Sequence, residues 1–392
     1  MPPRKPEVPL TTGHLVLMSI LGLAEFSRGA LLISLLPAYI TGPLAAPLIL
    51  AGWAVSSHYF LDTVCRGPAG WLVDRVGPAR VLTLGLAIEV MALVGAMNTR
   101  HPDLVVLFVA VLGVGTASHW PAVVTGVTRL TPSQQRASVM GLVFATWLTG
   151  AGIGPVAINF LLGGRDRLAF LILVGADVVA FVATILLTDP RLGAQVRESV
   201  HPGRWVRVLW PYRTIIPGMF LQNMTLGLMM PILQPFTHQV LRLSQWRFAE
   251  LLLGSGAFTV LLLVPMGRIT DRFGLKVPLV GGFFLAGLSL VGLGLIRQFL
   301  LVVLIGGLAG LAYAMILPAW NAFLANQIPK EIEGWLWGVF MTVEGLGMAV
   351  GPVVGARLFE MAVWAPFLTS AGVLLLMGAY YLWFPVGTVR AG

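Results

Sequence analysis

Long apolar runs separated by short polar links dominate the chain. Six runs occupy the first half, at residues 14–40, 46–71, 79–97, 104–128, 137–162 and 168–187. Six more follow at residues 215–240, 248–266, 277–296, 299–325, 335–359 and 364–384. Each run is long enough to cross about 30 Å of hydrocarbon as an α-helix, which satisfies its own backbone hydrogen bonds. The pattern predicts an all-α polytopic membrane protein with twelve transmembrane helices.

One long polar link divides these runs into two equal sets. It predicts an N-terminal six-helix bundle at residues 1–187, a linker at 188–214 and a C-terminal six-helix bundle at 215–392. The linker contains the segment RWVRVLWPYR, from Arg204 to Arg213. Arginines interleaved with tryptophan and tyrosine favour an amphipathic segment at the lipid headgroups, and a solvated linker is the alternative.

The two halves are related by a constant offset of 197 positions. Identical residues at this spacing are Pro68 and Pro265, Gly70 and Gly267, Asp74 and Asp271, Arg75 and Arg272, Gly77 and Gly274, Pro121 and Pro318, Gly150 and Gly347, Gly154 and Gly351, and Pro155 and Pro352. The offset runs without a gap over about 90 residues. The repeat indicates a duplicated six-helix unit, with the two copies in parallel orientation.

Composition agrees with a membrane protein and adds an orientation. With 57% apolar residues, 10% charged residues and a mean hydropathy of +0.88, a water-soluble globule is excluded. Of the 25 lysines and arginines, 17 fall on the side of the N-terminus and seven on the opposite side. This asymmetry places both termini in the cytoplasm and explains the net charge of +9 without a nucleic-acid partner. The single cysteine, Cys65, excludes an intrachain disulfide and a cysteine-rich metal site.

Charged residues inside the first two apolar runs are the most informative. Glu25 and Arg28 share one helix face, and His58, Asp62 and Arg66 form a stripe at four-residue spacing. A charge within a membrane costs at least ~2.5 kcal/mol, so each of these groups needs a partner or a wet cavity. We expect Glu25 and Asp62 to carry protons and Arg28 to bind an anionic substrate group or to act as counter-ion. A static ion-pair network between helices is the alternative.

The second half lacks these charges. At the constant offset, Gln222 replaces Glu25, Thr225 replaces Arg28 and Thr259 replaces Asp62. Positions where the copies diverge are free to specify substrate and coupling. The other intramembrane candidates for substrate contact are His58, His119, Trp120, Trp147, Gln222, Asn223 and Glu344. Helix packing and hydrogen bonds between helices are the alternative roles for these residues, and for the further intramembrane acids Glu89 and Asp177.

The motifs in the turns resemble those of the major facilitator superfamily. GWLVDRVGPAR from Gly70 and GRITDRFGLK from Gly267 are similar to its loop signature between helices two and three and to the copy between helices eight and nine. The resemblance implies alternating access and a cytoplasmic conformational lock formed by Gly70, Asp74, Arg75, Gly77, Asp271 and Arg272. Pro78 and Ala79 replace the basic residue usual after the glycine, which implies a weaker lock.

A second motif resembles the antiporter signature of the same superfamily. GAGIGP ends at Pro155, and GMAVGP ends at Pro352. Small residues allow close packing and proline permits bending, which implies a helix-packing role for Gly150, Gly154, Pro155, Gly351 and Pro352. The arginine that many drug-proton antiporters carry before the GxG of helix four is absent, because Val109 and Ala110 precede Gly113. A standard drug-antiporter assignment is thereby weakened.

A finer resemblance concerns the polar half. Glu25, Arg28, Asp62 and Trp120 are similar to the polar pocket of the glycolipid flippases of lipoteichoic acid synthesis. We expect a monomeric, proton-coupled secondary transporter of the cytoplasmic membrane that exports or flips an anionic or neutral amphiphile, a class that includes glycolipids. Its partners are membrane lipids, the substrate and protons.

Other functions remain as alternatives. A proton-driven efflux antiporter for drugs or small metabolites is the second hypothesis, and a non-transporting membrane sensor is the third. HExxH, GxSxG and Walker motifs are absent, so we expect no enzyme, no cofactor, no metal and no ATP-driven step.

Overall fold

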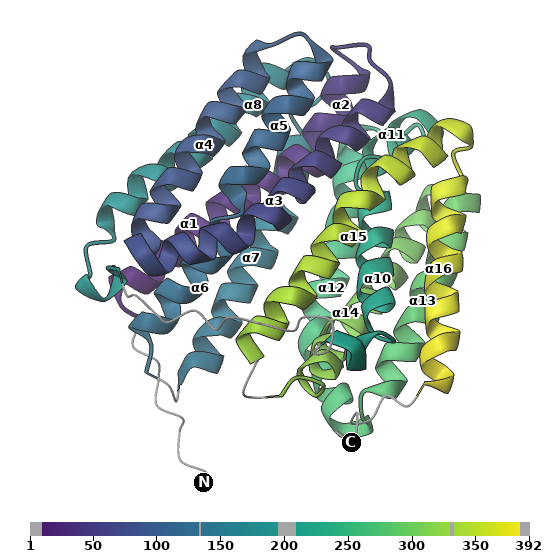
Figure 1. The fold of residues 1–392 in the computed structure, drawn as a ribbon. Helices are drawn as coiled ribbons and strands as arrows, with labels where there is room; N and C mark the ends of the chain where they lie inside the picture. The colour runs from purple at the N-terminus through teal and green to yellow at the C-terminus, as the bar shows by residue number, and fades with distance from the viewer. Residues whose placement is uncertain (1–9, 133–134, 195–208, 330–332, 385–392) are drawn as a thin grey trace. The chain divides into compact units, whose positions relative to one another are not determined.

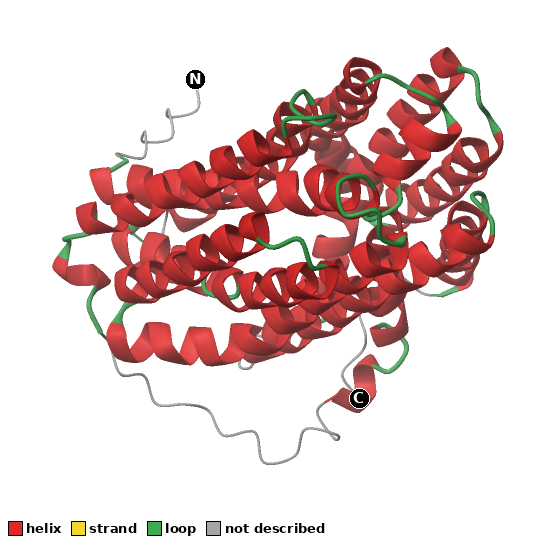
Figure 2. Cartoon of the chain, turned by 90° about the horizontal axis from the view of Figure 1, so that it is seen from above, coloured by secondary structure: helices red, strands yellow, loops and turns green. Residues whose placement is uncertain are grey.

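The protein is helical throughout the part that the structure describes. The computed structural model describes residues 10–132, 135–194, 209–329 and 333–384, with no strand among them (Figures 1 and 2). Eleven of its helices are long and apolar enough to cross a membrane, and a bent pair raises the number to twelve if it counts as one span. The predicted all-α polytopic architecture is confirmed.

The helices follow the predicted apolar runs. In the first half they are α1 (Thr12–Gly29), a π-helical segment (Ala30–Leu35), α2 (Leu36–Thr41), α3 (Leu48–Val76), α4 (Pro78–Asn98), α5 (Pro102–Thr116), α6 (His119–Leu130), α7 (Arg136–Asn159) and α8 (Asp166–Ala183). In the second half they are α10 (Ile216–Met229), α11 (Leu233–Pro235), a π-helical segment (Phe236–Val240), α12 (Gln245–Phe273), α13 (Lys276–Leu295), α14 (Phe299–Ala325), α15 (Glu333–Met361) and α16 (Ala365–Trp383). Short 3₁₀ turns lie at Thr184–Leu186, Pro190–Leu192 and Trp210–Tyr212. Of the predicted amphipathic linker segment, residues 204–208 lie outside the described residues.

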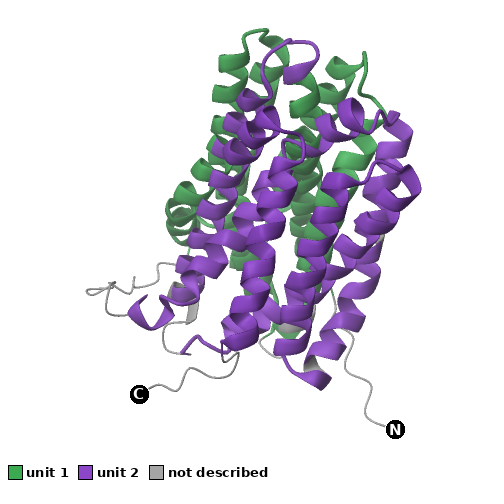
Figure 3. Ribbon diagram, turned by 90° about the vertical axis from the view of Figure 1, so that its right-hand side faces the viewer, with its two compact units in different colours: residues 1–39, 57–203 green, residues 40–56, 204–392 purple. Residues whose placement is uncertain are grey.

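The chain forms two compact units (Figure 3). Unit 1 comprises residues 1–39 and 57–203, and unit 2 comprises residues 40–56 and 204–392. The first turns of α3 belong to unit 2 because they pack on α15. A Cβ at Gly52 would lie 2.8 Å from the Pro352 carbonyl oxygen, and the Val353 amide donates to Ser56 Oγ at 3.2 Å. The predicted domain limits at 187 and 215 stay a prediction.

In unit 1, α1 packs against α6, α7 and α8. Leu17, Ile20, Leu21 and Ala24 are buried, and this i, i+3, i+4, i+7 spacing makes one continuous apolar face. The face joins a core that also contains residues of α4, α6 and α7. The helix forms and packs because its apolar stripe can be buried on three neighbours at once.

In unit 2, α10 lies beside α15, and α13 beside α16 (Figure 1). The core is aromatic, since Phe283, Trp320, Phe323 and Tyr381 meet with ring centroids 5.7–6.2 Å apart. These offset and edge contacts stabilise the bundle beyond the burial of apolar area alone.

Two predicted spans are interrupted, which the sequence pattern did not predict. The fourth run is split between α5 and α6 at residues 117–118, whereas its copy α14 is continuous. Gly115 stands in this run where α14 has Ala312, so helix propensity is lower just before Pro121. The seventh run bends by 43° between α10 and α11. Pro231 lies at this bend and cannot donate a backbone hydrogen bond.

A proline and a glycine form a matched contact in each unit. Pro155 has no N–H, so it cannot donate to the Ala151 carbonyl four residues earlier, and a Cβ at Gly29 would lie 2.7 Å from that oxygen. In unit 2, Pro352 leaves the Met348 carbonyl in the same position, 2.9 Å from a Cβ at Gly227. The contact recurs with Gly227 one residue beyond the offset of 197, and it brings α1 or α10 against the carbonyl that the proline leaves without a helical donor.

Gly154 provides a test of this close packing. A Cβ there would overlap the Phe26 carbonyl oxygen of α1 and lie 3.1 Å from the Ala30 amide, which begins the π-helical segment. We expect Gly154→Ala to destabilise the protein by about 1–3 kcal/mol, because backbone cannot move aside cheaply. The measurement is thermal unfolding in detergent followed by tryptophan fluorescence.

Gly152→Ala is the matched control on the same helix. A Cβ at Gly152 meets nothing within 4 Å, so the added methyl should leave the melting temperature unchanged or raise it through higher helix propensity. Equal losses of stability in the two variants would contradict the close-approach explanation.

Candidate functional site

A buried ion pair lies near the middle of the first span. Arg28 donates from Nε to Glu25 Oε2 at 3.0 Å, and its Nη2 lies 2.5 Å from the same oxygen. The side chains are only 15% and 7% exposed. Two donors on one oxygen fix the guanidinium relative to the carboxylate. The π-helical segment that begins at Ala30 follows directly, and such segments often occur at functional sites.

The second wall of this site comes from α3. Tyr59 accepts a hydrogen bond from Arg28 Nη1 at 3.5 Å, and the guanidinium lies 5.7 Å from the centre of its ring. One turn further along, Asp62 pairs with Arg66 at 2.5 Å. His58 is fully buried and its Nδ1 donates to the Val109 carbonyl at 3.3 Å. The residues of the predicted stripe therefore take part in two separate contacts. His58 bonds to the Val109 carbonyl and Asp62 pairs with Arg66, and each contact satisfies a buried polar group.

Two tryptophans predicted as substrate contacts lie together. Trp120 on α6 and Trp147 on α7 meet edge to face with ring centroids 6.4 Å apart, and Phe144 lies 5.1 Å from Trp120. Both tryptophans are only partly buried against the core of unit 1. An aromatic surface of this kind offers a stacking face to a sugar ring or an acyl chain.

His119 does not stand alone. Its Nε2 lies 2.7 Å from Glu89 Oε1 of α4, and both side chains are almost completely buried. A carboxyl and an imidazole at this distance share a proton readily. The structure thus places His119, predicted as a substrate contact, against an acid.

The candidates of unit 2 are held mainly by their own helices. Asn223 Nδ2 donates to the Met219 carbonyl at 3.2 Å, and the Gln222 backbone carbonyl accepts from Thr225 at 2.7 Å. Glu344 on α15 accepts from Trp320 Nε1 at 3.1 Å. Trp320 is thus a contact of Glu344 that the sequence pattern did not predict.

The predicted lock residues surround the turn between α3 and α4. Asp74 lies 3.6 Å from Arg129 of α6, and Arg75 covers the ring of Trp71 at 4.1 Å. Gly77 has φ +91°, and a Cβ there would meet the Leu192 carbonyl, so only glycine fits. Its copy Gly274 has φ +82°. The tight turn is duplicated, and the side chain of Asp271 lies outside the described residues.

The segment after the sixth span closes over this turn. Arg129 donates to the Gly193 carbonyl at 2.7 Å. Beside it, hydrogen bonds from the Arg191 side chain and amide lower the pKa of Asp189. These contacts tie the start of the linker to unit 1, and the predicted role of the turn as a lock stays a prediction.

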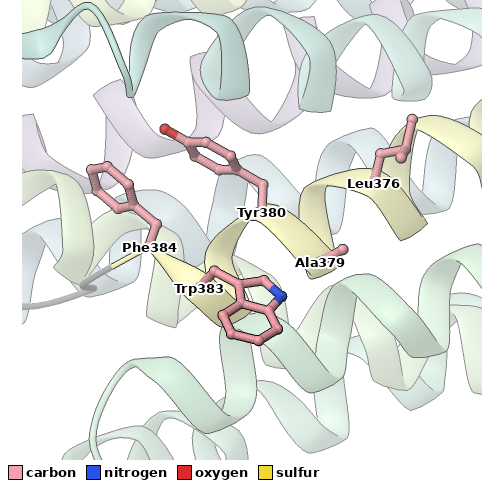
Figure 4. Close-up of a pocket in the computed structure, with 5 residues that line it drawn as sticks. All are labelled: Leu376, Ala379, Tyr380, Trp383 and Phe384. Carbon is pink, nitrogen blue, oxygen red and sulfur yellow. The ribbon is translucent and has the colours of Figure 1, made fainter.

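A shallow apolar hollow follows the last turns of α16 (Figure 4). It has a cavity volume of about 540 Å³, and its lining residues are Leu376, Ala379, Tyr380, Trp383 and Phe384. Trp383 is 85% exposed, as expected for an aromatic residue at a membrane interface. No charged residue lines it, so the candidate chemistry lies elsewhere.

Sequence reasoning predicted the charged members of the site and missed their neutral or distant partners. Tyr59 was missed, although it stands three residues before Asp62 on the same face of α3. Arg129 was missed as the partner of Asp74, because no spacing rule connects residues so far apart. Among the described residues, no cluster of three or more His, Cys, Asp or Glu side chains could hold a metal.

The geometry can now be compared with known proteins. The family model described as Major Facilitator Superfamily matches residues 17–258 and 215–391. The chain belongs to the major facilitator superfamily. Members of this superfamily are transporters, which agrees with the helical fold and with the duplicated motifs.

Two bacterial relatives are similar over nearly their whole length. The "Proton-coupled antiporter flippase LtaA" of Staphylococcus haemolyticus is 28% identical over 376 residues, which cover 93% of this chain and 92% of the relative. The protein of the same name from Staphylococcus epidermidis is 27% identical over 388 residues, covering 96% and 95%.

Solved superfamily structures share the fold. The nucleoside transporter NupG aligns with a TM-score of 0.76 at 15% identity, covering 95% of this chain and 98% of its own. A bacterial homologue of the human lysosomal transporter Spinster, in an inward-facing and occupied conformation, also aligns with a TM-score of 0.76 at 15% identity, covering 94% and 95%.

Arg28→Ala tests the energetic role of the buried pair. Removing the guanidinium leaves Glu25 buried without its partner, which we expect to cost about 3–5 kcal/mol in stability. The double variant Arg28→Ala with Glu25→Gln should recover part of that loss, because it removes the uncompensated charge. The measurement is thermal unfolding of the three proteins in one detergent.

Arg357 and Glu360 supply the control pair. They have the same three-residue spacing and lie 3.7 Å apart, but the Arg357 side chain is 70% exposed. Arg357→Ala should cost about 1 kcal/mol or less. If Arg28→Ala cost as little stability as Arg357→Ala, the buried Glu25 carboxylate would not require Arg28 as its partner.

Proposed function

We propose that the protein is a proton-coupled antiporter flippase that moves an amphiphilic lipid of the glycolipid class across a bacterial cytoplasmic membrane by alternating access. The buried Glu25–Arg28 pair is the observation that carries this proposal. The staphylococcal relatives, which are similar over more than nine-tenths of the chain, are named proton-coupled antiporter flippases, and this supports the same activity.

In this proposal, antiport arises because the Arg28 guanidinium binds either the ionised Glu25 carboxylate or the substrate, but not both at once. Arg28 binds Glu25 when that carboxyl is ionised, with both donors on a single oxygen. When a proton adds to Oε2 of Glu25, the charge attraction is lost and Arg28 becomes available to an anionic or hydroxyl group of the substrate. Loss of the substrate returns Arg28 to Glu25 and favours release of the proton. Proton and substrate thus alternate through the same residue.

The neighbours of this pair suit a sugar headgroup. Asp62 offers a second carboxyl on α3, and the Trp120–Trp147 edge offers apolar faces for stacking. His58 and His119 are the other candidate contacts of unit 1. Within unit 2, Gln222, Asn223 and Glu344 offer amide and carboxyl groups and stay candidate substrate contacts on the sequence alone. We assign Asp62 as the second proton carrier, because it is buried and paired with Arg66, which is itself partly exposed.

The turns supply the switching elements of this proposal. Gly70, Asp74, Arg75 and Gly77, with Asp271 and Arg272 of the copy, lock one conformation on the cytoplasmic side, where both termini also lie. The proline and glycine contacts at Gly150, Gly154 and Pro155, and at Gly351 and Pro352, allow helices to shift while staying packed. The protein acts as a monomer, since each unit completes its own helix bundle.

Glu25→Gln tests the coupling. In proteoliposomes with a pH gradient, this variant should lose gradient-driven transport of a fluorescent glycolipid but keep gradient-free exchange, because the amide cannot take up or release a proton. Asp103→Asn removes an exposed acid at the start of α5 and is the control that should transport normally. Unchanged coupling in Glu25→Gln would remove this residue from the mechanism.

A substrate panel separates this function from the second candidate. The GAGIGP motif at Gly150 to Pro155 is compatible with efflux of drugs, so lipophilic cations are assayed beside the glycolipid. Arg28 is cationic and should favour anionic or neutral substrates. Preference for lipophilic cations by tenfold or more, equivalent to about 1.4 kcal/mol, would overturn the glycolipid assignment.

A further inference from the structure

Three titratable side chains lie close together in the interior of unit 1, beside the Glu25–Arg28 contact but not part of it. Glu89 comes from α4, His119 from the first turn of α6 and Asp177 from α8, and α4 packs against both other helices. Asp177 is completely buried and Glu89 is 1% exposed. Neither oxygen of Asp177 has a hydrogen bond of normal geometry among the described residues, and the Ser27 hydroxyl of α1 is the group directed at it.

The backbone is shaped to admit these groups. Gly115 lets α5 approach Glu89 so closely that a Cβ would lie 2.7 Å from Glu89 Cγ. The break at residues 117–118 follows at once and sets His119 at the start of α6. An interrupted helix within a membrane is tolerated only where protein groups or water form hydrogen bonds with the backbone groups that the break leaves free.

The positive charges nearby are already engaged. The charged or titratable groups that face the three residues are Glu25 and Arg28 of α1 and His58 of α3. Arg28 is paired with Glu25, and His58 donates to the Val109 carbonyl. Asp62 of α3 is matched by Arg66. Both guanidinium groups among these described neighbours, Arg28 and Arg66, are therefore already paired and do not balance Glu89 and Asp177.

Charge balance then fixes the number of protons. With both carboxyls ionised and the imidazole neutral, the trio carries a charge of −2, and burying that charge in an apolar interior is prohibitively costly. Two added protons make it neutral. One resides on Asp177, and the other is shared between His119 Nε2 and Glu89 Oε1, where its transfer exchanges imidazolium–carboxylate for imidazole–carboxylic acid without changing the net charge.

We propose that Glu89, His119 and Asp177 form a second proton-binding site of unit 1, separate from the Glu25–Arg28–Asp62 site. Its proton binding is independent of the proposed function, whereas its contribution to the number of protons exchanged per substrate rests on that function.

Unit 2 supplies an internal comparison. At the offset of 197, Ala286, Ile316 and Leu374 replace the three residues, and Ile316 and Leu374 are part of an ordinary apolar core. The offset holds through α8, because Phe170 and Gly175 match Phe367 and Gly372. A six-helix unit therefore packs without polar groups at these positions, and the trio is not a requirement of the fold.

Infrared spectroscopy of the substrate-free protein in lipid nanodiscs at pH 7 tests the site directly. The wild type should show the C=O stretch of a protonated carboxylic acid in a dry environment. Asp177→Asn should lose the part of this band that comes from Asp177, and the exposed control Asp103→Asn should retain the whole band. An unchanged band in Asp177→Asn would mean that Asp177 is ionised, which overturns the proposal.

A second variant separates proton binding from packing. Glu89→Ala with His119→Ile and Asp177→Leu installs the residues of unit 2, whose core shows that they pack. We expect a folded protein that binds two fewer protons at pH 7 by potentiometric titration against the denatured state. An undiminished proton count would overturn the site.

The transport assay keeps this site distinct from the proposed function. If the triple variant loses the two protons while Glu25→Gln leaves transport coupled, the second site stands and the proposed coupling mechanism fails. If the band and the proton count are unchanged while Glu25→Gln uncouples transport, the proposed function stands and the second site fails.

Discussion

A charge buried in an apolar interior must be neutralised by a group within hydrogen-bond reach, and this constraint organises unit 1. The Glu25–Arg28 contact satisfies it with a guanidinium, Asp62 with Arg66, and Glu89 with His119. Each solution has a different consequence. A guanidinium keeps its carboxylate ionised for as long as the two stay paired, whereas an imidazole or an absent cation makes neutrality depend on protons alone. The helix contacts that hold these pairs are therefore also the contacts that set their protonation.

The internal duplication separates what builds the fold from what gives it chemistry. The proline and glycine contacts recur in both units, with Gly29 on the Ala151 carbonyl and Gly227 on the Met348 carbonyl. The ionisable residues occur in unit 1 alone at these offsets, and apolar or neutral residues replace them in unit 2. A shared scaffold tolerates polar groups in one copy because its stability comes from backbone packing and apolar stripes, which do not need them.

Periodic features of the sequence were sufficient to predict the helices, the repeat and the charged members of the site. The spacing of Glu25 and Arg28 put both on one helix face, and the structure brings them into contact. Long-range partners could not be predicted. Nothing in the spacing of Glu89 and His119 indicates that α4 and α6 meet there, because that contact depends on how closely the glycines of α4 and α5 allow the helices to approach. Helix interruptions were missed for a similar reason, since Pro121 coincides with a break and its copy Pro318 lies in a continuous helix.

The break and the buried polar groups of unit 1 coincide, and a physical reason connects them. Ending α5 at Thr116 leaves backbone groups that need partners, and Thr116 and Ala117 bond back to the Gly113 carbonyl. In the continuous helix α14, the position that corresponds to His119 is occupied by the apolar residue Ile316. Once the helix is interrupted, the interior is already polar, so the added cost of placing His119 and Glu89 there is smaller than in an intact apolar core. The interrupted backbone thus lowers the free-energy cost of burying His119 and Glu89, and these polar side chains in turn suit an interior that already contains polar backbone groups.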